Sequence, residues 1–230
     1  FVQIALAPCS PFSVTRELML ATSVLARESK VRMHTHLAET EEETAFCLEK
    51  FGLRPLDYLE SVGWLQDSVW LAHGIHFSEQ EILRLGTSNG GISHCPSSNM
   101  ILGSGICPAT TLENAGCALG IGVDGSASND GSNMIQELRM AFLLQRLADG
   151  AEFVSHEDVL RWGTCGSAAC LGRSDIGEIS EGKQADLALF SLDEPRFSGH
   201  DDPLAAILTC GSHRAAYVMV GGEWRVRQGV

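Results

Sequence analysis

Short apolar segments alternate with longer helical patterns through the first three quarters of the chain. Five apolar segments have the length of a strand and are bounded by polar or turn-forming residues. These segments are residues 4–7, 31–36, 69–73, 91–95 and 118–124. The pattern predicts five buried strands.

Helical periodicity follows each of these predicted strands. We expect helices at residues 13–28, 41–50, 55–62, 78–85, 110–115, 133–147 and 156–171. The fourth of these has the clearest start signal, because Ser78 can cap it and Glu81 stands at the capping-box position. The first has an apolar face made of Leu18, Leu20, Ala21, Val24 and Leu25.

Strands that alternate with helices predict an α/β fold with a parallel sheet. A complete (β/α)8 barrel takes about 250 residues, so residues 1–172 are expected to form only its C-terminal part, strands 4 to 8, with strands 1 to 3 missing. Beyond residue 172 the pattern changes to three strand-like segments, at residues 186–191, 206–209 and 215–226. We therefore expect a second unit, residues 173–230, that forms part of a small β-sandwich.

Composition excludes two classes of partner. The chain has 16 Lys and Arg against 29 Asp and Glu, a net charge of −13, and no block of basic residues. A nucleic acid polymer or an anionic membrane surface is therefore not an expected partner. No apolar run approaches the roughly 18 residues that cross a bilayer, and the N-terminal sequence does not have the pattern of a signal peptide.

The eight cysteines contain no Cys-x-x-Cys pair, and several lie in apolar segments. Scattered buried thiols are typical of a reducing cytoplasm rather than of a disulfide framework. Their spacing also does not fit a zinc ribbon.

A histidine-rich segment, HTHLAET at residues 34–40, contains the first candidate chemistry. Side chains alternate along a strand, so His34 and His36 should face the same way. Glu39 follows where the strand opens into a loop. Imidazole and carboxylate groups at a strand end can bind a metal and move protons. The alternative is that both histidines simply pack inside a polar barrel core.

Three further strand ends also have polar candidates. His73 ends the third strand, although a lone histidine there is more often structural. Residues 93–100 (SHCPSSNM) could be no more than a capped turn. Asp124 is harder to dismiss, because a carboxylate that ends a buried apolar strand is costly unless it binds something. In a barrel, all four strand ends would meet at one rim.

Other polar residues are expected to have ordinary roles. His76, His156, His200 and His213 are interpreted as surface or packing residues, and Glu41, Glu42 and Glu43 as a solvated helix start. No Gly-x-Ser-x-Gly elbow and no phosphate-binding Gly-x-x-x-x-Gly-Lys-Ser/Thr motif occurs. The His-x-Glu and Pro-Cys-x-x-Cys pattern of the other zinc deaminase class is absent as well.

The motifs together resemble the amidohydrolase superfamily, in its cytosine, guanine and triazine deaminase branch. The resemblance runs nearly end to end and is strongest to the 8-oxoguanine deaminase and hydroxyatrazine-type hydrolase groups. It rests on HTHLAET (34–40), LAHG (71–74), SHCPSSNM (93–100), GVDGSASND (122–130) and GKQADL (182–187), with the helix at residues 134–146.

This resemblance implies a hydrolytic deaminase that releases ammonia from an amino-substituted ring, such as 8-oxoguanine or a related purine or pterin. It implies one divalent metal, zinc or in some members iron, with His36 and Asp124 among its ligands. Glu39 would protonate a ring nitrogen, and His73 would orient the attacking water or the substrate. Asp124 would also accept a proton from that water. A homo-oligomer is implied too, since dimers and larger assemblies are common in this branch.

The sequence departs from the family pattern because the strand-1 His-x-His ligand pair has no counterpart. With two of four ligands, this chain alone should bind metal weakly or not at all. We expect the remainder to come from a longer protein or a second chain. Two alternatives stay open: a triazine hydrolase that removes chloride or an alkylamine, and a non-catalytic binding module on the same scaffold.

Overall fold

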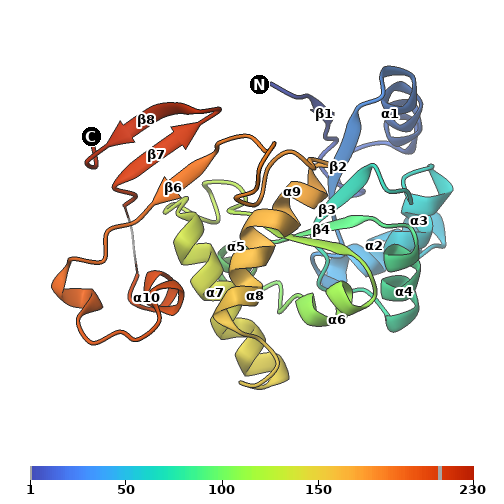
Figure 1. Cartoon of the computed structure of the whole chain (residues 1–230). Coiled ribbons are helices and arrows are strands. Elements are labelled where there is room, and N and C mark those ends of the chain that lie inside the picture. The colour runs from blue at the N-terminus through green and yellow to red at the C-terminus, as the bar shows by residue number, and fades with distance from the viewer. Residues whose placement is uncertain (1, 212–213) are drawn as a thin grey trace.

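The computed structural model describes residues 2–211 and 214–230, and its larger sheet is parallel with strand order β1-β2-β3-β4-β5 (Figure 1). Its strands are β1 (Ala5–Leu6), β2 (Arg32–Leu37), β3 (Val69–His73), β4 (Gly91–His94) and β5 (Ala118–Ile121). The five predicted strands and the parallel sheet are thus confirmed. The last strand is shorter than expected, and Asp124 lies three residues beyond its end.

Helices connect the strands in the order that the alternating pattern predicts. They are α1 (Arg16–Ser29), α2 (Glu41–Phe51), α3 (Pro55–Ser61), α4 (Glu79–Thr87), α5 (Pro96–Leu102), α6 (Ala109–Asn114), α7 (Met134–Asp149), α8 (His156–Arg161), α9 (Ser167–Cys170) and α10 (Pro203–Thr209). The capping box of α4 is present, with Ser78 and Glu81 satisfying each other's backbone N–H groups. No described helix has the length and apolar character that a bilayer crossing requires.

The two faces of the sheet have different surroundings, as β2 shows. Met33 and Leu37 are fully buried in the hydrophobic core, with Thr35 between them on the same face. The alternate residues Arg32, His34 and His36 are only half-buried. Because side chains alternate along a strand, His34 and His36 share the more open face, as predicted.

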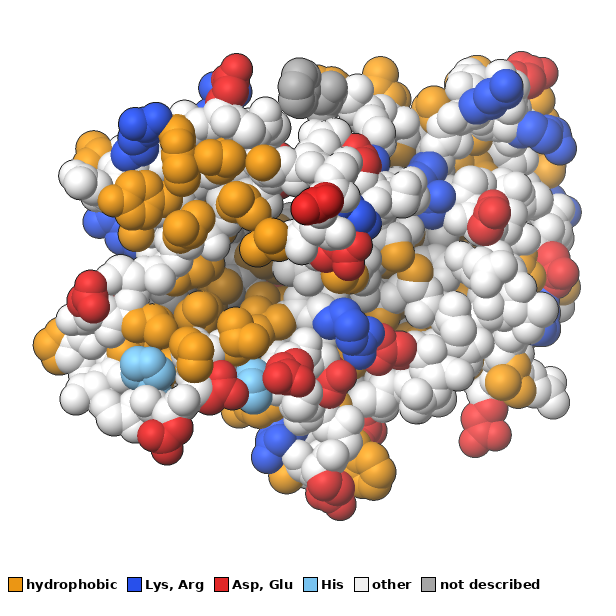
Figure 2. Space-filling view, viewed as in Figure 1, with side chains coloured by type: hydrophobic (Ala, Val, Ile, Leu, Met, Phe, Trp, Pro, Cys, Tyr) orange, Lys and Arg blue, Asp and Glu red, His pale blue; other side chains and the backbone are white. Residues whose placement is uncertain are grey.

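The sheet does not close into a barrel among the described residues. β1 pairs only with β2, and β5 pairs only with β4, so both edges are open. A second sheet has the order β6-β7-β8 and is antiparallel. Figure 2 shows apolar side chains gathered over β7 and β8 and in the hollow beside them. The strands of this sheet are β6 (Leu187–Leu189), β7 (Tyr217–Val220) and β8 (Glu223–Arg227).

Three segments differ from the sequence prediction. Residues 206–209 are not a strand but belong to α10, because Asp202 caps Leu204 N–H and Ala205 N–H and Pro203 starts the helix. The expected turn at residues 93–100 contains α5, which begins at Pro96. The single helix expected at residues 156–171 is divided by a π-helical turn, Trp162–Gly166.

The apolar face predicted for the first helix is not the face that α1 buries. Leu18 and Leu25 are about half exposed, whereas Met19, Thr22, Ser23 and Ala26 are buried. The buried hydroxyls of Thr22 and Ser23 donate to backbone carbonyls within the helix.

The predicted boundary between two units, residues 1–172 and 173–230, stays a prediction.

The π-helical turn lies directly against β5, and Gly166 makes the closest approach. A Cβ atom at Gly166 would lie 1.9 Å from the Leu119 carbonyl oxygen. We expect Gly166→Ala to lower the free energy of unfolding by about 2 kcal/mol or more, since overpacking forces backbone shifts. Urea denaturation of the longest natural form of the protein measures this effect. Gly131→Ala is the control, because its new Cβ would meet no atom closer than 3.6 Å; equal stability of both variants would contradict the prediction.

Candidate metal and proton-transfer site

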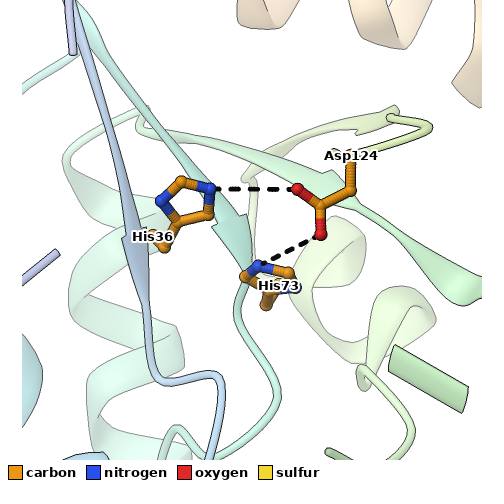
Figure 3. A group of neighbouring side chains, drawn as sticks. All are labelled: His36, His73 and Asp124. Atoms are coloured by element: carbon orange, nitrogen blue, oxygen red, sulfur yellow. Dashed lines mark ion pairs between the residues drawn. The ribbon is translucent and has the colours of Figure 1, made fainter. Parts of the chain in front are cut away.

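His36, His73 and Asp124 converge at the carboxyl edge of the parallel sheet (Figure 3). One ligand atom from each lies within 4.8 Å of the other two. The parallel register places Leu37 opposite His73, so the histidines of β2 and β3 are neighbours. Their rings stack with centroids 5.4 Å apart. His36 Nε2 is 3.9 Å from Asp124 Oδ1, and His73 Nε2 is 3.9 Å from Asp124 Oδ2.

Each histidine has its outer ring nitrogen fixed by an acceptor. His36 Nδ1 lies 2.6 Å from the Cys9 carbonyl oxygen, and His73 Nδ1 lies 2.8 Å from Asn99 Oδ1. In these contacts Nδ1 must carry the hydrogen, because both partners only accept. In the neutral imidazoles, both Nε2 lone pairs therefore point toward Asp124. Facing lone pairs and carboxylate oxygens repel unless a cation or a proton lies among them, so these residues fit a metal ion.

Glu39 adds a second carboxylate beside this cluster. Its Oε2 is 3.6 Å from His73 Nε2, and its Oε1 lies 3.5 Å from Ser104 Oγ, the donor. The side chain is 25% exposed, whereas His73 is 1% exposed. Glu39 is therefore open to a ligand on one side and in contact with the buried histidine on the other.

The backbone is strained at three positions of the site. Ala38, His73 and Asp124 have φ values of 53°, 72° and 61°, in the left-handed region that non-glycine residues rarely adopt. Such strain persists only where surrounding contacts hold it, and it is concentrated at functional sites. Here the Ala38 carbonyl accepts from Ile75 N–H and His76 N–H, which ties the β2 loop to the β3 loop.

Hydrogen bonds control the charge of Asp124. Partial burial by itself raises the pKa of this carboxyl. Hydrogen bonds from Ser98 and from the Gly125 backbone, with His73 and His36 nearby, outweigh burial and leave the pKa below its ordinary value. The Ser98 hydroxyl donates to Asp124 Oδ2 at 2.5 Å. Asp124 is thus held ionised beside the two imidazoles.

Two other histidines, one within β2 and one at the end of β4, do not join the cluster. His34 stacks on Trp70 at 4.8 Å, and burial lowers its pKa. His94 is completely buried, and burial lowers its pKa to about 3. Neither ring nitrogen of His94 has a hydrogen-bond partner among the described residues. Burial therefore favours the neutral form of both imidazoles.

The remaining histidines lie in contacts of their own. His76 Nε2 bonds the Ser104 carbonyl, His156 Nε2 is 2.9 Å from Asp202, and His200 bonds the Phe197 carbonyl. His213 lies outside the described residues.

The prediction of a solvated Glu43 is wrong, because this residue is only 2% exposed. Its Oε2 accepts from Glu39 N–H at 2.9 Å, and burial raises its pKa to about 7. The hydrogen bond from Ser98 to Asp124 was also missed. Nothing in the sequence distinguishes Glu43 from the neighbouring Glu41 and Glu42, because all three fit the acidic first turn of a helix.

The chain is similar to several known proteins. It is 64% identical over 228 residues to the 8-oxoguanine deaminase of Pseudomonas aeruginosa, an alignment that covers 99% of this chain and 51% of that protein. The chain spans about half the length of the curated relatives it matches.

Solved structures give the same picture. An adenosine deaminase from Xanthomonas campestris with bound zinc aligns with a TM-score of 0.94 and 33% identity, over 97% of this chain and 52% of the other. An atrazine chlorohydrolase from Arthrobacter aurescens TC1 complexed with zinc aligns with a TM-score of 0.93 and 36% identity, over 97% and 50%. The amidohydrolase family model matches residues 1–225. Fold, site and sequence agree, and the chain belongs to the amidohydrolase family.

Proposed function

We propose that the protein is a metal-dependent aminohydrolase that releases ammonia from 8-oxoguanine or a related purine or pterin. The observation that carries this proposal is the convergence of His36, His73, Asp124 and Glu39 at one edge of the sheet. The choice of ring is supported by the 64% identity to an 8-oxoguanine deaminase.

His36 and Asp124 would hold the metal, since both direct a free ligand atom to the same place. These residues would hold a divalent ion, with zinc favoured by the zinc-containing relatives, and such an ion would lower the pKa of a bound water toward neutrality. The family pattern adds a strand-1 His-x-His pair, which this sequence does not contain.

The residues of this chain would then move the protons. Asp124, kept ionised by Ser98, accepts a proton from the attacking water. Glu39 donates a proton to a ring nitrogen, which makes the amino-bearing carbon more electrophilic. His73 has its Nδ1–H engaged by Asn99, so its Nε2 can accept a hydrogen bond and orient the water or the ring.

Replacement of Asp124 tests the proposal directly. We expect Asp124→Asn, in the longest natural form, to abolish ammonia release and to lower the bound metal, because an amide is a weaker ligand and a poor base. Asp130→Asn is the matched control, since Asp130 is an exposed acid in the same loop. Metal content by elemental analysis and an ammonia assay with 8-oxoguanine are the measurements. Unchanged turnover would remove Asp124 from the mechanism.

Glu39 should affect the chemistry without affecting the metal. Glu39→Gln is expected to lower kcat by about 10²- to 10⁴-fold, the usual contribution of a positioned proton donor, with metal content unchanged. Glu42→Gln, an exposed acid in the first turn of α2, should retain full activity. A Glu39→Gln enzyme that deaminates at the rate of the wild type would show that another group supplies the proton.

Triazine hydrolysis is the second candidate, because an atrazine chlorohydrolase aligns over 97% of this chain. Product analysis separates the two: ammonia from a purine or pterin supports the deaminase, and chloride or an alkylamine from a triazine supports the alternative. Absence of both metal and turnover in a form that contains the strand-1 histidines would favour a non-catalytic binding module.

A further inference from the structure

A buried carboxylate on α7, Glu137, lies behind the candidate site. Glu137 is only 1% exposed. No Lys, Arg or His nitrogen lies within 4 Å of it in residues 2–211 and 214–230. Burying an unpaired carboxylate is costly unless hydrogen bonds compensate. The hydrogen bonds that offset the burial cost of Glu137 therefore indicate its role.

Both carboxylate oxygens of Glu137 are used, and they reach two different loops. Oε1 accepts from Asn129 Nδ2 at 2.8 Å, in the loop after β5. Oε2 accepts from Ser97 N–H at 3.1 Å, in the first turn of α5 after β4. The Asn129 amide also donates to the Val123 carbonyl at 2.8 Å. Glu137 thus joins the segment after β4, where α5 begins, to the loop after β5 that contains Asp124.

This junction continues to Asp124 through α5. Ser98, next to Ser97, donates to Asp124 Oδ2 at 2.5 Å, and Ser128 Oγ lies 2.7 Å from Ser98 Oγ. With Oδ2 held in this way, Asp124 Oδ1 is the oxygen directed toward His36 Nε2. The orientation of Asp124, which has a strained backbone, depends on how the loops after β4 and β5 are held together.

We propose that Glu137 is a positioning residue that fixes Asp124 for metal binding by clamping the loops after β4 and β5 through Ser97 and Asn129. The inference rests on the proposed metal site and deepens it. Residues that orient a metal ligand contribute about 10- to 100-fold to metal affinity when they are tested by mutation.

Replacement of Glu137 by glutamine tests this role without a change in side-chain size. The clamp needs two acceptors, because Asn129 Nδ2 and Ser97 N–H are both donors. Gln has nearly the shape of Glu but offers one acceptor and one NH₂ group, which would face a donor. Glu137→Gln should therefore open one side of the clamp while leaving the packing volume unchanged.

The experiment uses the longest natural form of the protein. Zinc affinity is measured by chelator competition, and urea denaturation is measured on the metal-free protein. Glu137→Gln is compared with Ser98→Ala, which removes the hydroxyl on Asp124 directly. Glu81→Gln is the matched control: Glu81 is also a buried carboxylate, but it bonds Arg54 and Ser78 N–H, away from Asp124.

We expect Glu137→Gln and Ser98→Ala each to weaken zinc binding by at least tenfold, and Glu81→Gln to change it by less than twofold. Loss of stability in Glu137→Gln with unchanged zinc affinity would overturn the proposal, since it would show a structural role only. If Glu137→Gln fails to fold, unchanged zinc affinity in Ser98→Ala overturns it. A wild-type protein that binds no zinc would overturn the proposed function as well. Zinc binding by the wild type, with unchanged affinity in the variants, would overturn only the inference about Glu137.

Discussion

The parallel pairing of β2 with β3 is the interaction on which the site depends. It puts Leu37 opposite His73, and thereby brings the histidine that ends β3 next to His36. Because all five strands run the same way, the chain leaving β5 reaches the same edge and delivers Asp124 there. A one-residue slip of β2 would turn His36 to the helix-covered face. The buried Met33 and Leu37 prevent that slip, since they would have to leave the core.

Electrostatics makes this convergence chemically specific. Cys9 and Asn99 occupy the outer nitrogens of His36 and His73, so both inner nitrogens present lone pairs. Asp124 and Glu39 add negative charge to the same small space. Four groups that would otherwise repel one another are stable together only if positive charge lies among them. The arrangement is therefore matched to a cation or to a proton in transit.

The sequence predicted what depends on periodicity and missed what depends on tertiary contacts. The strands, the Ser78 capping box and the shared face of His34 and His36 follow from local pattern and were correct. The helix α10 was mistaken for a strand because its segment is short and apolar, and only the Asp202 cap and Pro203 decide the matter.

The site was less predictable than the fold. The placement of His36 and Asp124 at one edge of the sheet could be predicted because each ends a predicted strand, where a polar group is conspicuous. Glu43 and Glu137 could not, because on helices with charged surfaces a buried glutamate has the same local pattern as an exposed one. The face of α1 fails for a related reason: its leucines mark an apolar side, but contacts with the sheet and with Trp64 bury the side of Met19 instead.

Three buried glutamates show how the outer layer supports the strand ends. Glu81 bonds Ser78 N–H and is neutralised by Arg54. Glu43 and Glu137 likewise accept backbone N–H groups, of Glu39 and Ser97, but neither is ion-paired within the described residues. A neutral side chain would cost less to bury than either of these carboxylates. However, a carboxylate holds a backbone N–H more strongly than an amide does. Glu43 bonds the backbone of Glu39, and Glu137 bonds Ser97 and Asn129 beside Asp124. The fold thus carries the greater burial cost where the geometry of the strand ends must be most exact.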